Sequence, residues 1–120
     1  MVSGSHCDIG KRQVGTVTVV AVAGTVDSVT APQLQAAIAD AAAAAPHAVV
    51  VDLGGVDFLS SAGMGVLMAA HADITPAARF GVVADGPATS RPLRLVGIAD
   101  VVGLFATLDE ALGAVSGGDV

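Results

Sequence analysis

The sequence predicts a small α/β domain in which helices cover a mixed sheet. Segments rich in β-branched residues alternate along the chain with segments in which apolar residues recur every three or four positions, which is the pattern of strands alternating with helices. The length of 120 residues is enough for one hydrophobic core but short for two. No internal repeat of solenoid length is present. We therefore expect a single domain.

The N-terminal part is expected to supply the first strands. Residues 1–13 are predicted to be a flexible segment with a possible short edge strand around Lys11 and Arg12. Residues 14–23, VGTVTVVAVA, are rich in Val and Thr and favour a strand, or a hairpin that turns near Gly15.

The first helix is expected to follow a loop. Gly24 is predicted to end the strand, and residues 25–29 to form the loop. Thr30 is a good N-cap for a helix in which Pro32 occupies an early position, and this helix should run to about Ala45. The side chains expected to face inward are Leu34, Ile38 and Ala41 or Ala42.

The central stretch, residues 49–71, reads VVVDLGGVDFLSSAGMGVLMAAH. Its three consecutive valines favour a strand covered on both faces. The strand is expected to be interrupted by Asp52, Gly54 and Gly55. A helix is predicted from Ser61, because apolar residues then recur at helical spacing and Ser60 or Ser61 can supply an N-cap oxygen.

The remaining elements follow the same alternation. The expected elements are a strand at 80–84, a helix capped by Thr89 or Ser90 and ended by Gly97, a short strand at 101–105, and a last helix from Thr107 to about Val115. Glu110 lies three residues after Thr107, which is the spacing of a capping box.

The composition argues against nucleic acid as a partner. Five basic residues against eleven acidic ones give a formal net charge of −6, which repels nucleic acid and anionic membranes. Trp and Tyr are absent, so aromatic platforms for base stacking are scarce. A protein partner fits this composition better.

The cysteine count and the hydropathy pattern indicate a cytoplasmic protein without a membrane segment. Cys7 is the only cysteine, so no intrachain disulfide can form. The start of the chain does not read as a signal peptide. The longest apolar run, within residues 63–70, is much too short to cross a bilayer.

The central stretch resembles a known motif. From Asp52 to Gly65 the order of residue types is similar to the central motif of STAS domains, in particular of bacterial anti-sigma factor antagonists. Residues 24–27 and 30–34 resemble the family's earlier turn and first helix. The resemblance covers residues 14–115, which leaves 116–120 as a C-terminal tail. It implies a STAS-like domain, with a mixed sheet of four or five strands and about four helices that lie mostly on one face.

The resemblance also implies a regulatory site. Matching Gly63 and Gly65 onto the family places its phosphoserine on Ser61, at the positive end of the predicted helix. The family often has Asp immediately before this serine, and here that position is Ser60, which stands as the alternative phosphate acceptor. The residues expected to bind the partner are Asp27, Ser60, Ser61, Ala62, Gly63, Met64 and Gly65.

Other polar residues have simpler interpretations. Asp52 is expected to border the serine loop together with Asp27, or only to hydrogen-bond the amides of its own turn, which we prefer. Asp57 is expected to be a solvated loop charge. Arg91 and Arg94 form a small basic spot that is either a solvated face or a second contact region.

No catalytic or metal-binding pattern is present in the sequence. Neither serine lies in a G-x-S-x-G elbow, and the three histidines are dispersed. We expect no enzyme activity, no cofactor and no metal.

The resemblance implies partner switching. The unphosphorylated chain, a monomer when free, would bind an anti-sigma factor and so release a sigma factor. In the family this partner is usually a GHKL-type serine kinase that uses ATP and magnesium. Phosphorylation on Ser61 would end the binding. The alternatives are a STAS scaffold or small-ligand sensor and, third, an enzyme with Ser61 as nucleophile.

Overall fold

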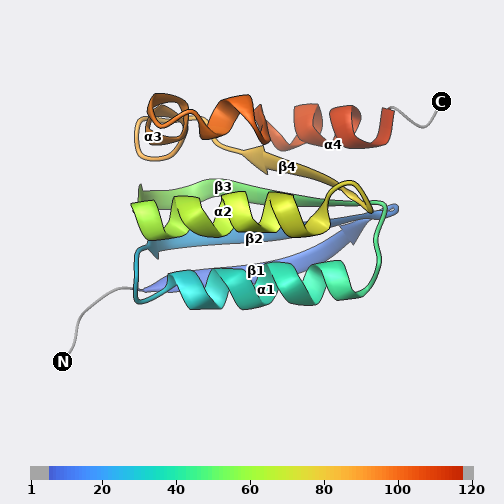
Figure 1. Cartoon of the computed structure of the whole chain (residues 1–120), viewed down its shortest axis with the longest axis horizontal. Helices are drawn as coiled ribbons and strands as arrows, with labels where there is room; N and C mark the ends of the chain where they lie inside the picture. Colours follow the sequence, from blue (N-terminus) through green and yellow to red (C-terminus); the bar gives the residue numbers. More distant parts are fainter. Residues whose placement is uncertain (1–5, 118–120) are drawn as a thin grey trace.

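We describe residues 6–117 from a computed structural model, and Figure 1 shows the whole chain. The structure confirms the predicted class, a mixed sheet with helices, and it has five strands and four α-helices within these residues. The elements are β1 (Cys7–Val14), β2 (Val17–Val26), α1 (Ala31–Ala43), β3 (Ala48–Leu59), α2 (Ser61–Ile74), β4 (Arg79–Val83), α3 (Ser90–Leu95), the 3-10 helix η1 (Ile98–Asp100), β5 (Gly103–Phe105) and α4 (Leu108–Gly117).

The strands lie in the sheet in the order in which they occur in the chain, β1-β2-β3-β4-β5. The β1 and β2 strands form an antiparallel hairpin that turns at Gly15, where φ is +62°, which confirms the predicted turn. All other neighbours are parallel. The edge strand β1 is eight residues long, so it is longer than predicted. Residues 1–5 of the predicted flexible segment and residues 118–120 of the predicted tail lie outside the described part of the chain.

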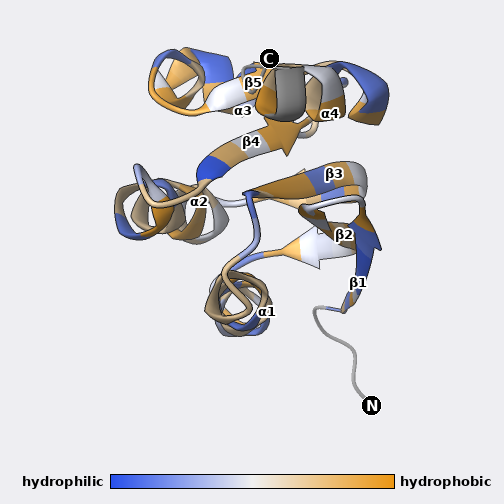
Figure 2. Ribbon diagram, turned by 90° about the vertical axis from the view of Figure 1, so that its right-hand side faces the viewer, coloured by the Kyte–Doolittle hydropathy of each residue, from blue (hydrophilic) through white to orange (hydrophobic). Residues whose placement is uncertain are grey.

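The topology explains which face each helix covers. From β2 to β5 each strand is added on the same side of the previous one, and the right-handed crossover that such connections prefer places every connecting helix on one face. Accordingly, α1 and α2 lie on one face of the sheet, and α4, which follows the last strand, packs on the other (Figure 2). Most of the helices therefore share one face, as predicted.

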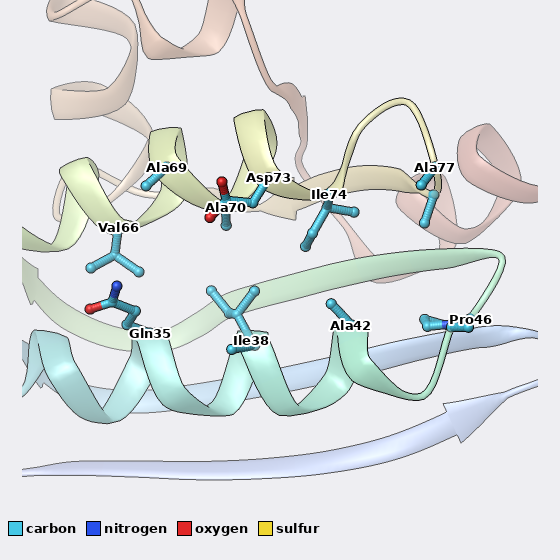
Figure 3. Close-up of a pocket in the computed structure, with 13 residues that line it drawn as sticks. Gln35, Ile38, Ala42, Pro46, Val66, Ala69, Ala70, Asp73, Ile74 and Ala77 are labelled. Atoms are coloured by element: carbon cyan, nitrogen blue, oxygen red, sulfur yellow. The ribbon is translucent and has the colours of Figure 1, made fainter.

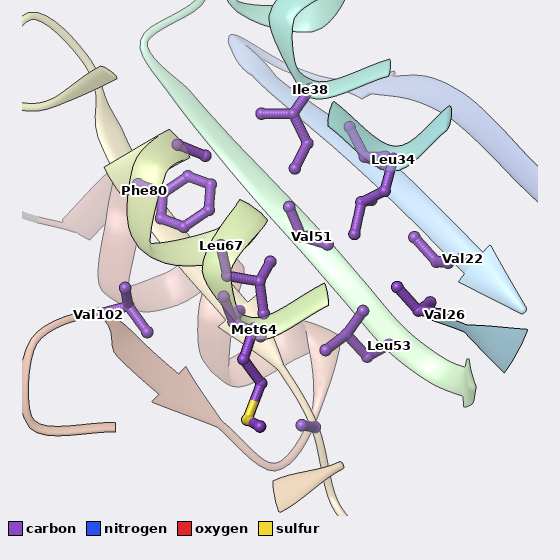
Figure 4. Close-up of a cluster of buried hydrophobic side chains, with 14 of the residues drawn as sticks. Val22, Val26, Leu34, Ile38, Val51, Leu53, Met64, Leu67, Phe80 and Val102 are labelled. Carbon is purple, nitrogen blue, oxygen red and sulfur yellow. The ribbon is translucent and has the colours of Figure 1, made fainter. Parts of the chain in front are cut away.

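Two hydrophobic clusters fill the space between these layers. The larger lies between the sheet and the first three helices and includes Leu34, Val51, Leu67 and Phe80 (Figure 4). The smaller joins α4 to the opposite face of the sheet. The predicted inward positions of α1 are confirmed, because its buried residues are Ala31, Leu34, Ile38 and Ala41.

The glycines near the middle of the chain do not end their strands, and that prediction is wrong. β2 continues past Gly24 to Val26, and β3 runs without interruption through Gly54 and Gly55. The pairing of the two strands instead shifts register at two places, as in β-bulges. A Cβ on Gly55 would lie 2.8 Å from the Cβ of Ala23, so this glycine permits close approach of the two strands.

Other boundaries differ by a few residues. α1 ends at Ala43, earlier than predicted, because the chain turns at Ala45, where φ is +55°. The last strand starts at Gly103, after η1, whereas Val101 was the predicted start. Gly97 adopts the left-handed conformation predicted for it, with φ of +83°. α4 reaches Gly117, two residues past the expected end.

Candidate functional site

The predicted serines lie where two parallel strands end. β2 and β3 are parallel neighbours, so their carboxyl ends meet at one edge of the sheet, which we call the carboxyl edge. There the amide of Ser60 donates a hydrogen bond of 2.8 Å to the carbonyl of Val26. The loop between β2 and α1, which contains Asp27, is thereby held beside the start of α2.

Ser60 and Ser61 have different surroundings. Ser60 is the N-cap of α2, with extended backbone (φ −84°, ψ 173°), and its hydroxyl oxygen accepts a hydrogen bond of 3.3 Å from the amide of Gly63. Ser61 is the first residue of the helix and is exposed. Within residues 6–117 its hydroxyl makes no hydrogen bond. The prediction that one of the two serines caps the helix is confirmed for Ser60.

The start of α2 has the features of an anion site. Among the described residues, the amides of Ser61 and Ala62 have no acceptor, because the ladder of the helix begins with the bond from the Met64 amide to the Ser60 carbonyl. These amides and the helix dipole favour negative charge at this end.

The other predicted contact residues of α2 differ in exposure. Gly63 and Met64 are buried, and Met64 belongs to the larger hydrophobic cluster. A Cβ on Gly63 would lie 2.6 Å from Val26 Cγ1 and 2.8 Å from Leu59 Cδ1. Gly63 thus lets the helix approach the sheet closely. Gly65 is exposed and has no atom within 4 Å of an added Cβ.

Asp27 organises the neighbouring loop. Its Oδ1 accepts hydrogen bonds from the amides of Val29 (2.9 Å) and Thr30 (3.1 Å). Thr30 stands at the N-cap position of α1, but its side chain makes no capping bond. Instead its hydroxyl donates to the carbonyl of Thr25 at 2.7 Å and accepts from the amide of Asp27 at 3.0 Å. Asp27 and Thr30 therefore fix the loop that faces the serines.

Asp52 does not border this site, and that prediction is wrong. β3 continues from Asp52 for seven more residues, to Leu59, which at about 3.3 Å a residue separates Asp52 from the end of the strand. Its Oδ1 accepts a hydrogen bond of 2.9 Å from the amide of Gly54, as in the interpretation that we preferred. Asp57 is exposed, as predicted, but it lies in β3 and not in a loop.

Two exposed apolar side chains flank the serines, and the sequence did not single them out. Val29 is 70% exposed and Phe58 is 52% exposed. Val29 lies in the Asp27 loop, and Phe58 lies two residues before Ser60. The exposure of Phe58 could not be predicted from the sequence. Inward and outward side chains of a strand are predicted from their alternation, and the register shift between β2 and β3 breaks this alternation.

The single cysteine lies close enough to Asp27 to sense its charge. Partial burial raises the pKa of the Cys7 thiol above its ordinary value of 9.0, and the negative charges of Asp8 and Asp27 raise it further. The thiol is therefore protonated at neutral pH.

A groove runs between α1 and α2 (Figure 3), and neither Ser60 nor Ser61 lines it. Its volume is about 440 Å³. Most of its lining is alanine and aliphatic side chains, including Ile38, Val66 and Ile74, and its polar side chains are Gln35 and Asp73.

No cluster of three or more His, Cys, Asp or Glu side chains within residues 6–117 could hold a metal ion. None of the helices in this part of the chain is long and apolar enough to cross a membrane.

Comparison with known proteins matches the sequence to a domain family. The STAS domain family matches residues 8–111. The chain therefore belongs to the STAS domain family, as the central motif had suggested.

Individual relatives narrow the class. The chain is 41% identical over 104 residues to the anti-sigma-F factor antagonist RsfB of Mycobacterium tuberculosis, which covers 87% of this chain and 85% of RsfB. Its structure is similar to that of an anti-sigma factor antagonist from Mycobacterium paratuberculosis, with a TM-score of 0.91, 40% identity and coverage of 97% and 99% of the two chains.

A more distant structure shares the fold. The Bacillus cell fate determinant SpoIIAA in its phosphorylated form has a TM-score of 0.67, with 20% identity and coverage of 90% of this chain and 99% of SpoIIAA. The two closer likenesses put the chain with the anti-sigma factor antagonists, which are non-enzymatic regulators.

Proposed function

We propose that this protein binds an anti-sigma factor through the carboxyl edge of its sheet, and that a phosphate on Ser61 ends the binding. The observation that carries the proposal is the exposed Ser61 hydroxyl at the amino end of α2, beside the Asp27 loop. RsfB, 41% identical, is an antagonist of an anti-sigma-F factor, which supports an anti-sigma factor as the partner.

The geometry favours Ser61 over Ser60 as the phosphate acceptor. The Ser60 hydroxyl is occupied as the helix cap, whereas the Ser61 hydroxyl is exposed and has no hydrogen bond within residues 6–117. A phosphate carries nearly two negative charges, and the amino end of a helix stabilises such a charge. The fold itself can therefore accept the modification, and SpoIIAA, which shares the fold, has been solved in a phosphorylated form.

A bound partner could not accept it as easily. Val29 and Phe58 give the surface around the serines apolar area that a partner would cover. Burying a phosphate in such an interface without a compensating cation costs several kcal/mol, and about 1.4 kcal/mol already weakens binding tenfold. Phosphorylation is thus sufficient to convert a tight complex into a weak one.

The remaining residues have supporting roles in the proposal. Asp27 and Ala62 would contact the partner beside the serines, and Gly65 would do so from the exposed side of α2. Gly63 and Met64 are buried, so they would act by holding the start of the helix in place.

The partner is proposed to be a serine kinase of the GHKL type, which binds ATP and magnesium itself. The chain would then need no cofactor of its own. We further propose that it works in the cytoplasm, is a monomer when free, and does not bind nucleic acid or membranes, in keeping with its net charge of −6.

The test is phosphorylation by the candidate anti-sigma kinases of the same genome. The wild-type chain, Ser61→Ala and Ser60→Ala are each incubated with purified kinase, ATP and magnesium, and the phosphate is located by mass spectrometry. We expect one phosphate on Ser61 in the wild type and in Ser60→Ala, and none in Ser61→Ala. A phosphate on Ser60 would show that Ser60 is the acceptor. If no candidate kinase phosphorylates the chain or forms a complex with it, the proposed partner is contradicted.

The groove between α1 and α2 favours a second candidate, a small-ligand sensor. Its volume of about 440 Å³ lies within the usual range of ligand sites, and its lining is largely apolar with few polar groups. A ligand there would raise the melting temperature in proportion to the logarithm of its concentration. A metabolite screen by thermal unfolding tests this function, and Ala42→Phe, which fills the groove, should abolish any stabilisation.

A further inference from the structure

A second exposed apolar surface lies on α3 and the segment after it. Its residues are Arg91, Arg94, Leu95, Val96 and Val101, which together we call the α3 patch. Leu95 is 76% exposed, Val96 58% and Val101 48%. Six large hydrophobic side chains are exposed among the described residues, and three of them belong to this patch. These three side chains lie within residues 95–101, and exposed apolar side chains that lie close together mark interaction sites more often than single ones do.

These side chains do not serve the core. Leu93, which is fully buried, and Ile98, which is 7% exposed, fill the position beneath α3. Successive residues of a helix are about 100° apart, so Leu95 lies on the side opposite Leu93. The sequence therefore places a large aliphatic side chain in water where a polar one would serve the fold equally well.

The two arginines suit a protein interface. Neither Arg91 nor Arg94 forms an ion pair with any residue between 6 and 117, whereas Lys11 pairs with Asp40. Both are exposed. Arginine beside apolar side chains is enriched in protein interfaces, and its guanidinium binds a carboxylate with two parallel hydrogen bonds.

The patch lies at the same edge of the molecule as the serines. β4 is parallel to β3, so α3, which follows β4, starts at the carboxyl edge from which α2 also starts. Figure 1 shows α3 at the end of the molecule where α2 begins. A partner seated on the start of α2 can therefore extend along this edge to α3.

We propose that the α3 patch is a second docking surface for the anti-sigma factor, and that it receives a partner surface of apolar side chains bordered by carboxylates. The inference rests on the proposed function. A membrane is a poorer occupant, because the chain has eleven acidic residues against five basic ones and anionic lipid would repel it. The contact would not involve Ser61, so the patch would add affinity and partner choice without being part of the switch.

The test compares two patch variants with matched controls. Leu95→Asp and the double variant Arg91→Glu/Arg94→Glu change exposed side chains of the patch. Val14→Asp and Arg79→Glu are the controls, and they make one apolar-to-Asp change and one Arg-to-Glu change at exposed positions of the opposite edge. Binding to the purified anti-sigma factor is measured by calorimetry at two salt concentrations, and thermal unfolding of each variant reports its fold. Ser61→Glu is measured in parallel.

We expect each patch variant to weaken binding at least tenfold, and the controls to remain within twofold of the wild type. The arginine variant should also lose part of the salt dependence of binding. If Ser61→Glu abolishes the complex but both patch variants bind within twofold of the wild type, the second surface alone is overturned. If the wild-type chain forms no complex with any candidate anti-sigma factor, the proposed function and this inference are overturned together. Two other outcomes are self-association of the chain and its flotation with vesicles of phosphatidylglycerol. If Leu95→Asp removes either behaviour and leaves anti-sigma binding unchanged, the second docking surface is also overturned.

Discussion

The hydroxyl of Ser60 accepts a hydrogen bond from the amide of Gly63, while the hydroxyl of its neighbour Ser61 is exposed to solvent. A serine at the N-cap contributes about 1 kcal/mol to stability, and an exposed serine one position later contributes much less. We therefore expect Ser60→Ala to lower the free energy of unfolding by about 1 kcal/mol, and Ser61→Ala to change it by less than about 0.5 kcal/mol. Urea unfolding of both variants measures this, and equal losses would contradict the assignment of Ser60 as the cap.

Two glycines of the same helix offer a sharper comparison. At Gly63 a methyl group would lie 2.6 Å from Val26 and 2.8 Å from Leu59, whereas at Gly65 it would meet nothing within 4 Å. Gly63→Ala should therefore destabilise the protein by about 1–3 kcal/mol through overpacking. Gly65→Ala should be neutral or stabilise it by up to about 1 kcal/mol, because Ala has the higher helix propensity. A Gly63→Ala variant as stable as the wild type would contradict the close contact between α2 and the sheet.

Cys7 reports on the charge of the Asp27 loop. Because burial, Asp8 and Asp27 raise the pKa of its thiol above 9.0, less thiolate is present in the folded protein than in the unfolded chain near that pH. Alkylation by iodoacetamide at pH 9 should be slower in the native than in the urea-unfolded protein, and Asp27→Asn should accelerate the native reaction. Asp73→Asn is the remote control. If native Asp27→Asn is alkylated at the same rate as the native wild type, the thiol does not sense the charge of the loop.

The same pKa fixes the sign of a stability effect. The protonated Cys7 thiol contributes to the free energy of unfolding. This contribution is complete below the pKa of the thiol in the unfolded chain, near 9.0, and it is lost as the pH rises through the higher pKa of the native protein. The free energy of unfolding should therefore fall at alkaline pH by less in a Cys7→Ser variant than in the wild type.

At the scale of single elements, the sequence predicted those whose signals are local. The hairpin turn at Gly15, the start of α2 and the last helix all depend on residues within one turn of the chain. In the last helix the Thr107 hydroxyl accepts a hydrogen bond of 3.1 Å from the amide of Glu110, which confirms one half of the capping box. The Glu110 carboxylate completes it differently, because it accepts a hydrogen bond of 3.2 Å from the amide of Ala106 and not from that of Thr107.

The prediction failed where an element depends on a distant partner. Gly54 and Gly55 looked like a break, but the neighbouring β2 strand supplies the pairing that carries β3 through them. The same register shift leaves Phe58 exposed beside the serines. Single-chain periodicity cannot show a bulge, because a bulge is a property of two paired strands. The interpretation that placed Asp52 beside the serines, which was not the preferred one, failed for the same reason, since β3 continues past Asp52 to Leu59.

At the scale of the whole molecule, the order of the strands decides where function can lie. Since β2, β3 and β4 are parallel, the Asp27 loop, the start of α2 and the start of α3 all gather at one edge. The sequence predicted the first two as a site through their resemblance to the family. For α3 it left open whether Arg91 and Arg94 are a solvated face or a second contact region, because the resemblance carried no role for residues 90–101.

The domain limits predicted from the sequence, residues 14 and 115, remain a prediction. Because β1 pairs with β2 from Cys7 onward, we propose that the folded unit begins at or before Cys7. A chain that starts at residue 14 would lose the edge strand and expose one side of β2. Its melting temperature should be lower than that of a chain that starts at residue 6, and equal values would support the limit at residue 14.

The central claim is that one phosphate on Ser61 switches the binding of an anti-sigma factor. The most direct measurement is the dissociation constant of the purified complex, determined in parallel for the unphosphorylated chain and for the chain phosphorylated on Ser61. We predict that the phosphate weakens binding at least 100-fold, which corresponds to about 2.8 kcal/mol. Thermal unfolding should show the phosphorylated chain to be as stable as the unmodified one. Dissociation constants that agree within twofold would contradict the switch.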